Sequence, residues 1–361
     1  MKKNNLLINF FFYFFFLFIF IFFTNTHFNF QESLQFGGAD GFSYMSISKD
    51  SPFFTTEKMM SIHSERFFFP YIIGLVSKLI KIDIYTLYKF FVFIILIIIN
   101  IFTIKILMHL KLNFQTILIF LTLINLNPYI TRFYISIPTI INDLIFVAGV
   151  LVIAEKIIVN NNKFFVIVGY IFSFASRQTS IALIIGYLIS FFIKGKKLIN
   201  LKFELIGLFF FVGFIALNFY YSSNTIENMS SRYELYSPKM RILGFFVQNV
   251  PLKEKLIFLV LPLLSFFPLL FFLLLSRKLK YSLKQILNSK VLVFLFSFVL
   301  LVAMQPILSG VEVTGRNILR LTSLAYIPFL IFTIMITKQR KNFLVNNNYF
   351  FIIMIIVSIF H

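Results

Sequence analysis

The fold of this chain is decided by residues 164–193, FFVIVGYIFSFASRQTSIALIIGYLISFFI, which are apolar except near the middle. A single helix of this stretch would be about 45 Å long at 1.5 Å per residue and would place Arg177 at the centre of a bilayer. An arginine in that position costs at least a few kcal/mol. We therefore expect two short helices with Arg177 at the turn between them.

The composition indicates a membrane protein. Of 361 residues, 59% are hydrophobic, 13% are charged and none is cysteine. Soluble proteins keep about a quarter of their residues charged, so a soluble globular enzyme, a disordered chain and a disulfide scaffold are excluded. The net charge of +20 would suggest nucleic acid in a soluble protein. In a membrane protein it reports which side each loop faces, so we expect no nucleic-acid partner.

Further apolar stretches have the length of a transmembrane helix, roughly 17–25 residues. They are Leu6–Phe23, Ile84–Ile104, Phe114–Ile130, Ile135–Ile158, Leu201–Tyr221, Leu256–Leu275, Val291–Pro306, Leu319–Ile336 and Tyr349–Phe360. Lys2 and Lys3 precede the first of them, but no small-residue cleavage site follows before His27. We expect the first segment to be retained as a helix rather than removed as a signal peptide.

Basic loops set the orientation, because cytoplasmic loops carry an excess of lysine and arginine. Clusters at residues 194–202, 277–290 and 338–341 are expected on the cytoplasmic side with the amino terminus. Because both ends of the segment 4–194 are then cytoplasmic, this segment must cross the membrane an even number of times. This number is even if Phe67–Ile80, which is too short to span, lies at the outer surface. In the alternative topology, Phe67–Ile80 crosses and Phe164–Ile193 is a single helix. This alternative only exchanges comparable groups of basic residues between the two sides of the membrane, so charge does not choose between the topologies. Helix length and the cost of a central arginine favour the first one.

The expected fold is an all-α polytopic membrane protein. It has about eleven transmembrane helices, an inner amino terminus, an outer carboxyl terminus and outer-face juxtamembrane helices in the first long loop. Residues 1–275 form a membrane module with outer loops at 24–83 and 222–255, and residues 276–361 add carboxyl-terminal transmembrane helices. In this arrangement 11 of the 13 acidic residues lie outside, so chemistry is expected there.

The first outer loop contains a candidate catalytic carboxylate. It reads Gly37-Gly38-Ala39-Asp40-Gly41-Phe42-Ser43-Tyr44, with helical periodicity from Asp40 onward. Asp40 after two glycines also fits a helix N-cap. Glu65 and Arg66 further on also fit a solvated helix start before Pro70.

Two spaced pairs in this loop resemble a family. Asp40-x-x-x-Tyr44 just after the first membrane helix, followed by Arg66-x-x-x-Pro70 opening a short apolar helix, resembles the GT-C glycosyltransferases. The resemblance extends over about residues 1–220, with weaker echoes at Pro138-x4-Asp143 and Ser176-Arg177-Gln178-Thr179. The loop lacks the adjacent acidic pair that some members have, which bears on metal use.

The resemblance implies a hexosyl- or pentosyltransferase in the bacterial inner membrane with its active site facing the periplasm. Such an enzyme takes sugar from a polyprenyl-phosphate donor and passes it to a lipid, glycan or protein. Asp40 would be the base, or a ligand if carboxylates gather around a divalent cation. The residues expected to bind substrate are Tyr44, Arg66, Asp143, Arg177, Arg316 and Arg320.

Each of these residues also has a purely structural interpretation. Asp143 fits an ion pair with Arg132 or Arg177, and Arg177 itself fits a side chain that snorkels to headgroups. Arg316 and Arg320 are four residues apart and would also suit anionic lipid on one helix face.

Two other functions fit the whole chain. One is a transporter or flippase of a lipid-linked saccharide or other anion, and the second is a non-catalytic assembly subunit. No Walker loop, dinucleotide fingerprint or cysteine-based site occurs in the sequence.

Overall fold

The computed structural model describes residues 3–24, 38–56, 59, 61–159, 164–194, 201–225, 238–275 and 283–337. Over these residues the chain is helical without β-strands, which confirms the all-α class. The α-helices are α1 (Lys3–Thr24), α3 (Gly38–Asp50), α4 (Ser61–Ser64), α5 (Phe68–Ile80), α6 (Ile84–His109), α7 (Phe114–Leu126), α8 (Phe133–Ser136), α9 (Ile141–Val159), α10 (Phe165–Ser176), α11 (Ile181–Lys194), α12 (Leu201–Thr225), α14 (Pro238–Val247), α15 (Leu252–Leu275), α16 (Leu283–Asn288), α17 (Lys290–Thr314), α18 (Ile318–Ser323) and α19 (Tyr326–Ile336). Shorter turns of π- or 3-10 helix are η2 (Pro128–Arg132), η3 (Pro138–Ile140), η4 (Gln178–Ser180) and η5 (Gly315–Asn317).

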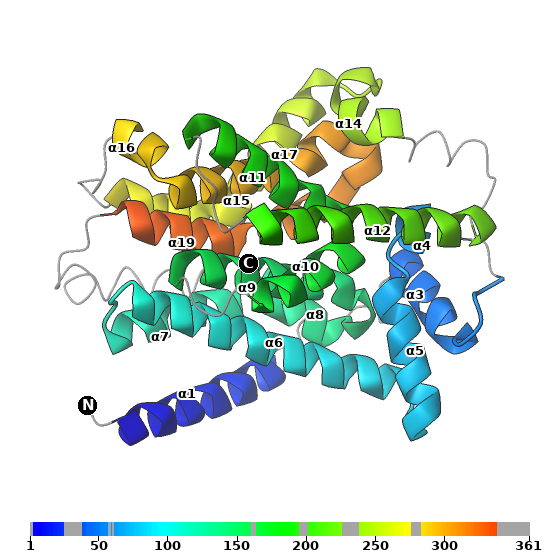
Figure 1. Ribbon diagram of the computed structural model, residues 1–361, viewed down its shortest axis with the longest axis horizontal. Coiled ribbons are helices and arrows are strands. Elements are labelled where there is room, and N and C mark those ends of the chain that lie inside the picture. Colours follow the sequence, from blue (N-terminus) through cyan, green and yellow to red (C-terminus); the bar gives the residue numbers. More distant parts are fainter. Residues whose placement is uncertain are drawn as a thin grey trace.

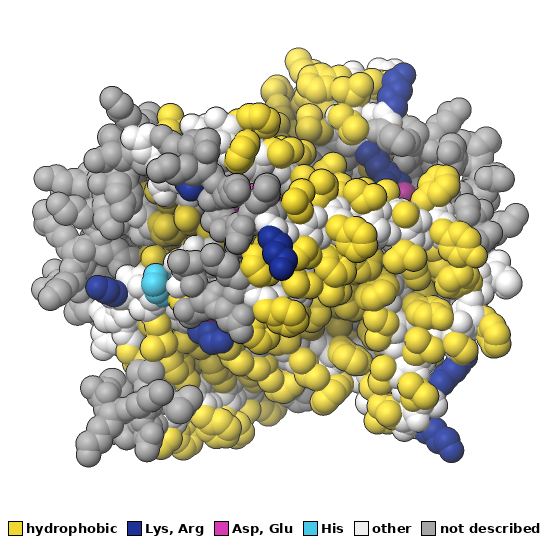
Figure 2. Space-filling view, viewed as in Figure 1, with side chains coloured by type: hydrophobic (Ala, Val, Ile, Leu, Met, Phe, Trp, Pro, Cys, Tyr) yellow, Lys and Arg dark blue, Asp and Glu magenta, His cyan; other side chains and the backbone are white. Residues whose placement is uncertain are grey.

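By length and apolar composition, three helices in the described part of the chain are able to cross a membrane. They are Ile84–His109, Lys202–Ser222 and Lys290–Thr314, and a fourth span results if α7 and residues 128–136, bent by 58°, form one unit. Hydrophobic side chains cover much of the face shown in Figure 2, and Phe209 and Phe219 of α12 are exposed by 74% and 75%. This surface is compatible with a membrane protein. The expected Tyr349–Phe360 helix and most of the basic clusters lie outside the described residues.

Helix α9 forms the centre of the helix bundle. Every side chain from Ile141 to Lys156 is buried, including the charged ones. The helix packs between α6 and α10, and the long helices run roughly alongside one another in Figure 1. A helix that is apolar on all sides is suited to such a central place.

The stretch 164–193 forms two helices, as expected. Helix α10 ends at Ser176, Arg177 has extended backbone angles (φ −152°, ψ 144°), and a 3-10 turn leads into α11 at Ile181. Arg177 is therefore placed at a break between helices, where its side chain can turn to a partner.

Helix α5 lies across the direction of α6 and α12 at one end of the molecule (Figure 1). It ends where Lys81 adopts the left-handed conformation, and α6 begins at once because the Asp83 carboxylate accepts from the Thr86 amide at 2.9 Å. At only 13 residues, α5 spans about 20 Å. This geometry fits the short surface helix expected at Phe67–Ile80.

Helix α3 is held against α5 and α6 by one small polar contact. The Ser48 hydroxyl donates to the Pro70 carbonyl oxygen at 2.7 Å and shares a hydrogen bond with the Tyr88 hydroxyl at 2.8 Å. Gly74 of α5 allows this approach, because a Cβ added there would lie 2.0 Å from the Ser48 carbonyl oxygen. These three helices therefore place the first turn of α3, which carries Asp40.

Replacing Gly74 by alanine tests this close contact. Because the added Cβ meets backbone rather than a flexible side chain, we expect Gly74→Ala to lower the free energy of unfolding by about 1–3 kcal/mol. Gly213→Ala on α12 is the matched control, since a Cβ there has no heavy atom within 4 Å and alanine favours helix. Thermal unfolding in detergent measures both, and equal behaviour of the two variants would contradict the proposed packing.

Candidate functional site

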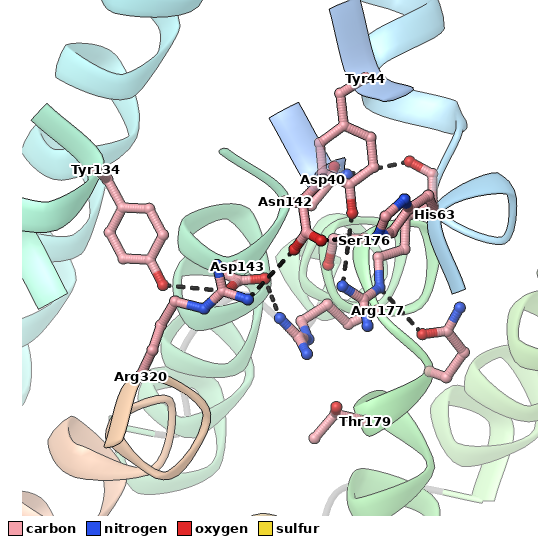
Figure 3. A network of polar contacts seen from close by, with 12 residues as sticks. Asp40, Tyr44, His63, Tyr134, Asn142, Asp143, Ser176, Arg177, Thr179 and Arg320 are labelled. Atoms are coloured by element: carbon pink, nitrogen blue, oxygen red, sulfur yellow. Dashed lines mark hydrogen bonds and ion pairs between the residues drawn. The ribbon is translucent and has the colours of Figure 1, made fainter. Parts of the chain in front are cut away.

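The candidate site is a cluster of charged side chains that converge from α3, α4, α9, α18 and the break between α10 and α11 (Figure 3). We call five of them the ion cluster: Asp40, Arg66, Asp143, Arg177 and Arg320. Its arginines and Asp143 are buried, and the Asp40 side chain is 22% exposed. Buried charges are stable only when they are paired, so the pairing defines what the site can bind.

Asp40 lies in the first turn of α3, where a negative charge is favourable to the helix. Its Oδ1 is 2.7 Å from Nε2 of His63, and its Oδ2 accepts from Nη2 of Arg320 at 3.4 Å. With the proton of His63 on Nε2, the ring donates to Asp40, and Nδ1 accepts from the Ser43 hydroxyl at 3.0 Å.

These contacts control the charge of Asp40. Burial raises the pKa of Asp40, but the hydrogen bond from His63 and the positive charges of Arg320 and Arg66 lower it by more. The net effect holds the pKa of Asp40 well below its ordinary value, so the carboxylate is charged at neutral pH. A carboxylate with such a low pKa is a weak base as long as both arginines face it.

Asp143 is the fully buried acid of the cluster. It lies in the first turn of α9, where its Oδ1 accepts from Nη1 of Arg177. Its Oδ2 is 3.5 Å from Nε of Arg320 and accepts from the Tyr134 hydroxyl at 3.3 Å. Of the structural partners considered for Asp143, Arg177 is therefore the one present.

Arg320 joins the two acids. Its Nη2 reaches Asp40 and its Nε faces Asp143, while the guanidinium carbon lies 5.4 Å from the centroid of the Phe133 ring. Arg320 is 5% exposed, which does not suit a side chain that binds lipid headgroups. It therefore ties α18 to α3 and α9 through charge.

Arg66 is the one arginine of the ion cluster that forms no ion pair with a carboxylate among the described residues. Its Nε donates to Oε1 of Gln178 at 3.2 Å, and its Nη1 donates to the Tyr44 hydroxyl at 3.5 Å. Both partners are uncharged at neutral pH, and Arg66 is only 6% exposed. A buried arginine whose hydrogen bonds all go to neutral groups is a place where an anion is bound favourably.

The ion cluster has a surplus of positive charge. It contains three guanidiniums and two carboxylates, and Nε of Arg177 is buried without a hydrogen-bond partner in the described part of the chain. One further negative charge with acceptor oxygens would balance the cluster and satisfy this donor. A phosphate group has that chemistry, because arginine binds phosphate with two parallel hydrogen bonds.

A second polar chain extends from Arg66 toward α14. Nε2 of Gln178 donates to Oε2 of Glu65 at 2.7 Å, and Glu65 forms a two-pronged ion pair with Arg241 at 3.0 and 3.3 Å. Glu65 and Arg241 are only partly buried. The polar chain thus leads from the buried cluster to the molecular surface.

The structure brings together six of the seven residues predicted to form the site. Asp40, Tyr44, Arg66, Asp143, Arg177 and Arg320 converge on one cluster. The side chain of Arg316 lies outside the described residues.

Several structural interpretations of these residues are wrong. Helix α3 begins two residues before Asp40, so Asp40 is a first-turn residue and not the N-cap. Arg66 is buried rather than at a solvated helix start. Arg177 is 3% exposed and paired with Asp143, so it does not snorkel.

Sequence reasoning missed the residues that hold this cluster together. His63, Tyr134, Gln178 and Arg241 all contact it or the polar chain beside it. Two of them had a local signal: His63 lies three residues before Arg66 in the same loop, and Gln178 belongs to the Ser176-Arg177-Gln178-Thr179 stretch. The contacts of Tyr134 and Arg241 join distant segments and have no mark in the local pattern.

The residues do not fit a divalent cation. Among the described residues no group of three or more histidine, aspartate or glutamate side chains is arranged to hold a metal. Both carboxylates of the ion cluster already face arginines, and a cation between them would meet three positive charges. The alternative role of Asp40 as a metal ligand is therefore not supported by these donors.

Comparison with known proteins gives no relative: no family model, curated protein or solved structure matches the chain. The geometry of the site is therefore the basis for any function, and the resemblance to the GT-C glycosyltransferases rests on the spaced residues expected in the first outer loop.

Proposed function

We propose that this chain is an integral membrane glycosyltransferase that moves a sugar from a polyprenyl-phosphate donor to an acceptor at the outer face. One observation carries the proposal: a buried cluster with surplus positive charge contains a carboxylate, Asp40, that is still partly exposed. Such a site matches a substrate with a phosphate at one end of the reacting bond and a hydroxyl to be deprotonated at the other.

The arginines would bind the donor phosphate. Arg66 lacks a carboxylate partner in the described chain, and Nε of Arg177 lacks an acceptor there, so a phosphate oxygen satisfies both. Arginine has the same charge at every physiological pH. The phosphate that leaves with the polyprenyl chain would be stabilised by these groups as its negative charge grows.

Asp40 would be the base. It takes the proton of the acceptor hydroxyl while the acceptor oxygen bonds to the anomeric carbon and the bond from that carbon to the phosphate oxygen breaks. The products are the glycosylated acceptor, polyprenyl phosphate and protonated Asp40. Phosphate bound at Arg66 offsets one of the charges that lower the pKa of Asp40, so donor binding makes Asp40 a stronger base.

The proposed topology places this reaction at the periplasmic side of a bacterial inner membrane. Eleven spans, with the amino terminus inside and the carboxyl terminus outside, put α3, α4 and α5 at the outer face. The placement of α5 across the other helices and the break at Arg177 support this count (Figure 1). In the alternative topology, α5 crosses the membrane and Ile82 is cytoplasmic.

Cysteine accessibility tests the topology, since the chain has no cysteine of its own. We expect Ile82→Cys to react with a membrane-impermeant maleimide in intact right-side-out vesicles. Glu254→Cys is the outer control, and Lys278→Cys, in a basic cluster, should react only after permeabilisation. Reaction of Ile82→Cys only after permeabilisation would instead establish the alternative in which α5 crosses.

Substitution of Asp40 tests the proposed base. We expect Asp40→Asn to slow release of polyprenyl phosphate by about 10²–10⁴-fold, the usual contribution of a general base. The assay follows a panel of undecaprenyl-phosphate sugars with membranes that contain the protein. Asp50→Asn, at the other end of α3, is the control, and unfolding temperatures are compared. Release by Asp40→Asn at the rate of the control would overturn the role of Asp40.

Substitution of Arg66 tests anion binding without turnover. We expect dodecyl phosphate to raise the unfolding temperature of the protein, as any ligand of the folded state does. Loss of a charge-assisted hydrogen bond in Arg66→Gln should weaken this binding about tenfold to hundredfold. Lys78→Gln removes an equal charge from the exposed end of α5 and should bind normally. Equal binding by both variants would show that Arg66 does not bind the phosphate.

A further inference from the structure

A cavity lies beside the ion cluster, and the proposed function gives it no role. It has a volume of about 260 Å³ and lies between α12 and the break that joins α10 to α11. Glu65 and Gln178, which link it to Arg66, form part of its wall. Ligand pockets usually measure about 300–1,000 Å³, so this cavity has room for one end of an amphiphile.

One face of α12 forms a wall of the cavity whose character changes along the helix. Its lining residues are Phe211, Phe214, Ile215, Asn218, Phe219 and Ser222. The spacing of three and four residues places these side chains on one stripe of the helix. The first three are apolar, and the polar side chains of Asn218 and Ser222 come later along the helix, on either side of Phe219. The cavity therefore has an apolar end and a polar end.

The cavity is open on the side where the molecule presents apolar side chains. Ile181, Ile215 and Phe219 line it and are exposed by 48%, 50% and 75%. Helix α12 belongs to the helices able to cross a membrane, and the surface in Figure 2 is largely hydrophobic. A molecule anchored in the bilayer would therefore reach this cavity sideways, with its chain toward the apolar end.

The polar end has one acceptor that lacks a donor in the described chain, beside a carboxylate that is already paired. Oδ1 of Asn218 is buried and has no hydrogen-bond partner among the described residues. The Glu65 carboxylate lines the same cavity. Acceptors of this kind attract hydroxyl groups and repel a phosphate, because a phosphate diester or anion brings only further acceptor oxygens. This preference is the reverse of that of the ion cluster.

We propose that this cavity binds the uncharged, hydroxyl-bearing end of a membrane-anchored acceptor, an inference that rests on the proposed transferase function. The arginines then hold the anionic donor, and the cavity holds the acceptor next to it. Gln178 separates the two, since its Oε1 accepts from Arg66 and its Nε2 donates to Glu65. The anionic donor therefore binds on the Arg66 side of the Gln178 amide, and the uncharged acceptor binds on the Glu65 side.

Photolabelling tests the proposal directly. The probe is dodecyl β-D-glucoside with a diazirine in its chain, applied to the full-length protein in phosphatidylcholine nanodiscs, and labelled peptides are identified by mass spectrometry. We expect labelling on α12 that excess dodecyl β-D-glucoside displaces and dodecyl phosphate does not. Loss of one hydrogen bond in Asn218→Leu should weaken labelling about twofold to tenfold.

Filling the cavity provides a matched pair of variants. Ile215→Trp should abolish displaceable labelling because the larger side chain occupies the cavity. Leu217→Trp makes the same kind of change on α12, on a side chain that is 48% exposed and lies outside the cavity lining, and should be labelled normally. Equal labelling of both variants, or displacement by dodecyl phosphate as effective as by the glucoside, would overturn the proposal.

The same measurement separates this proposal from the transferase function. Labelling needs no turnover, so we expect it to persist in Asp40→Asn. Labelling that fails while sugar release still depends on Asp40 would reject the acceptor cavity alone. Labelling that persists while no donor is turned over would leave a glycoside-binding cavity and reject the transferase.

Discussion

The need to pair buried charge is the constraint on which the rest of this structure depends. Arg320 and Asp40 are 280 positions apart in the chain, and Arg320 also faces Asp143, which has no exposed surface. Removing one member of such a set leaves an uncompensated charge in a poorly solvated place. The pairs therefore hold α3, α9 and α18 in one arrangement, and the apolar helices pack around it.

A rigid platform brings Asp40 to these partners. Ser48 joins α3 to both α5 and α6, and Gly74 lets the backbones of α3 and α5 meet. Asp40 lies two turns before Ser48 on the same helix, so the direction of α3 determines where the carboxylate points. The platform explains how Asp40, in the first turn of α3, reaches the side chains of Arg320 and His63.

The proposed chemistry follows from two neighbouring places with opposite electrostatic preference. On one side, three arginines exceed two carboxylates, which favours an anion. On the other, Asn218 offers an acceptor to a hydroxyl group, and the Glu65 carboxylate adds negative charge to the wall. Gln178 contacts both sides with its two different amide atoms. A transfer between an anionic donor and a neutral acceptor needs such a separation, because each substrate is then excluded from the place of the other.

The sequence by itself determined the helical class, the break at Arg177 and a set of candidate site residues. These features follow from local physics: a charge cannot lie in the middle of an apolar helix, and 30 apolar residues exceed one span. The expected number of spans was obtained by adding up many apolar stretches. Among the described residues, only three or four helical units are long and apolar enough to cross a membrane.

Only the tertiary structure decided which charges meet. Local pattern allowed Asp40 to be an N-cap and Arg66 a solvated residue, and in the structure both are partners in a cluster. Tyr134 and Arg241 contact the cluster or the polar chain beside it, and no spacing in the sequence marks either contact. The physical reason is that hydrophobic periodicity specifies which face of a helix is buried, whereas the pairing of buried charges depends on which helices pack together.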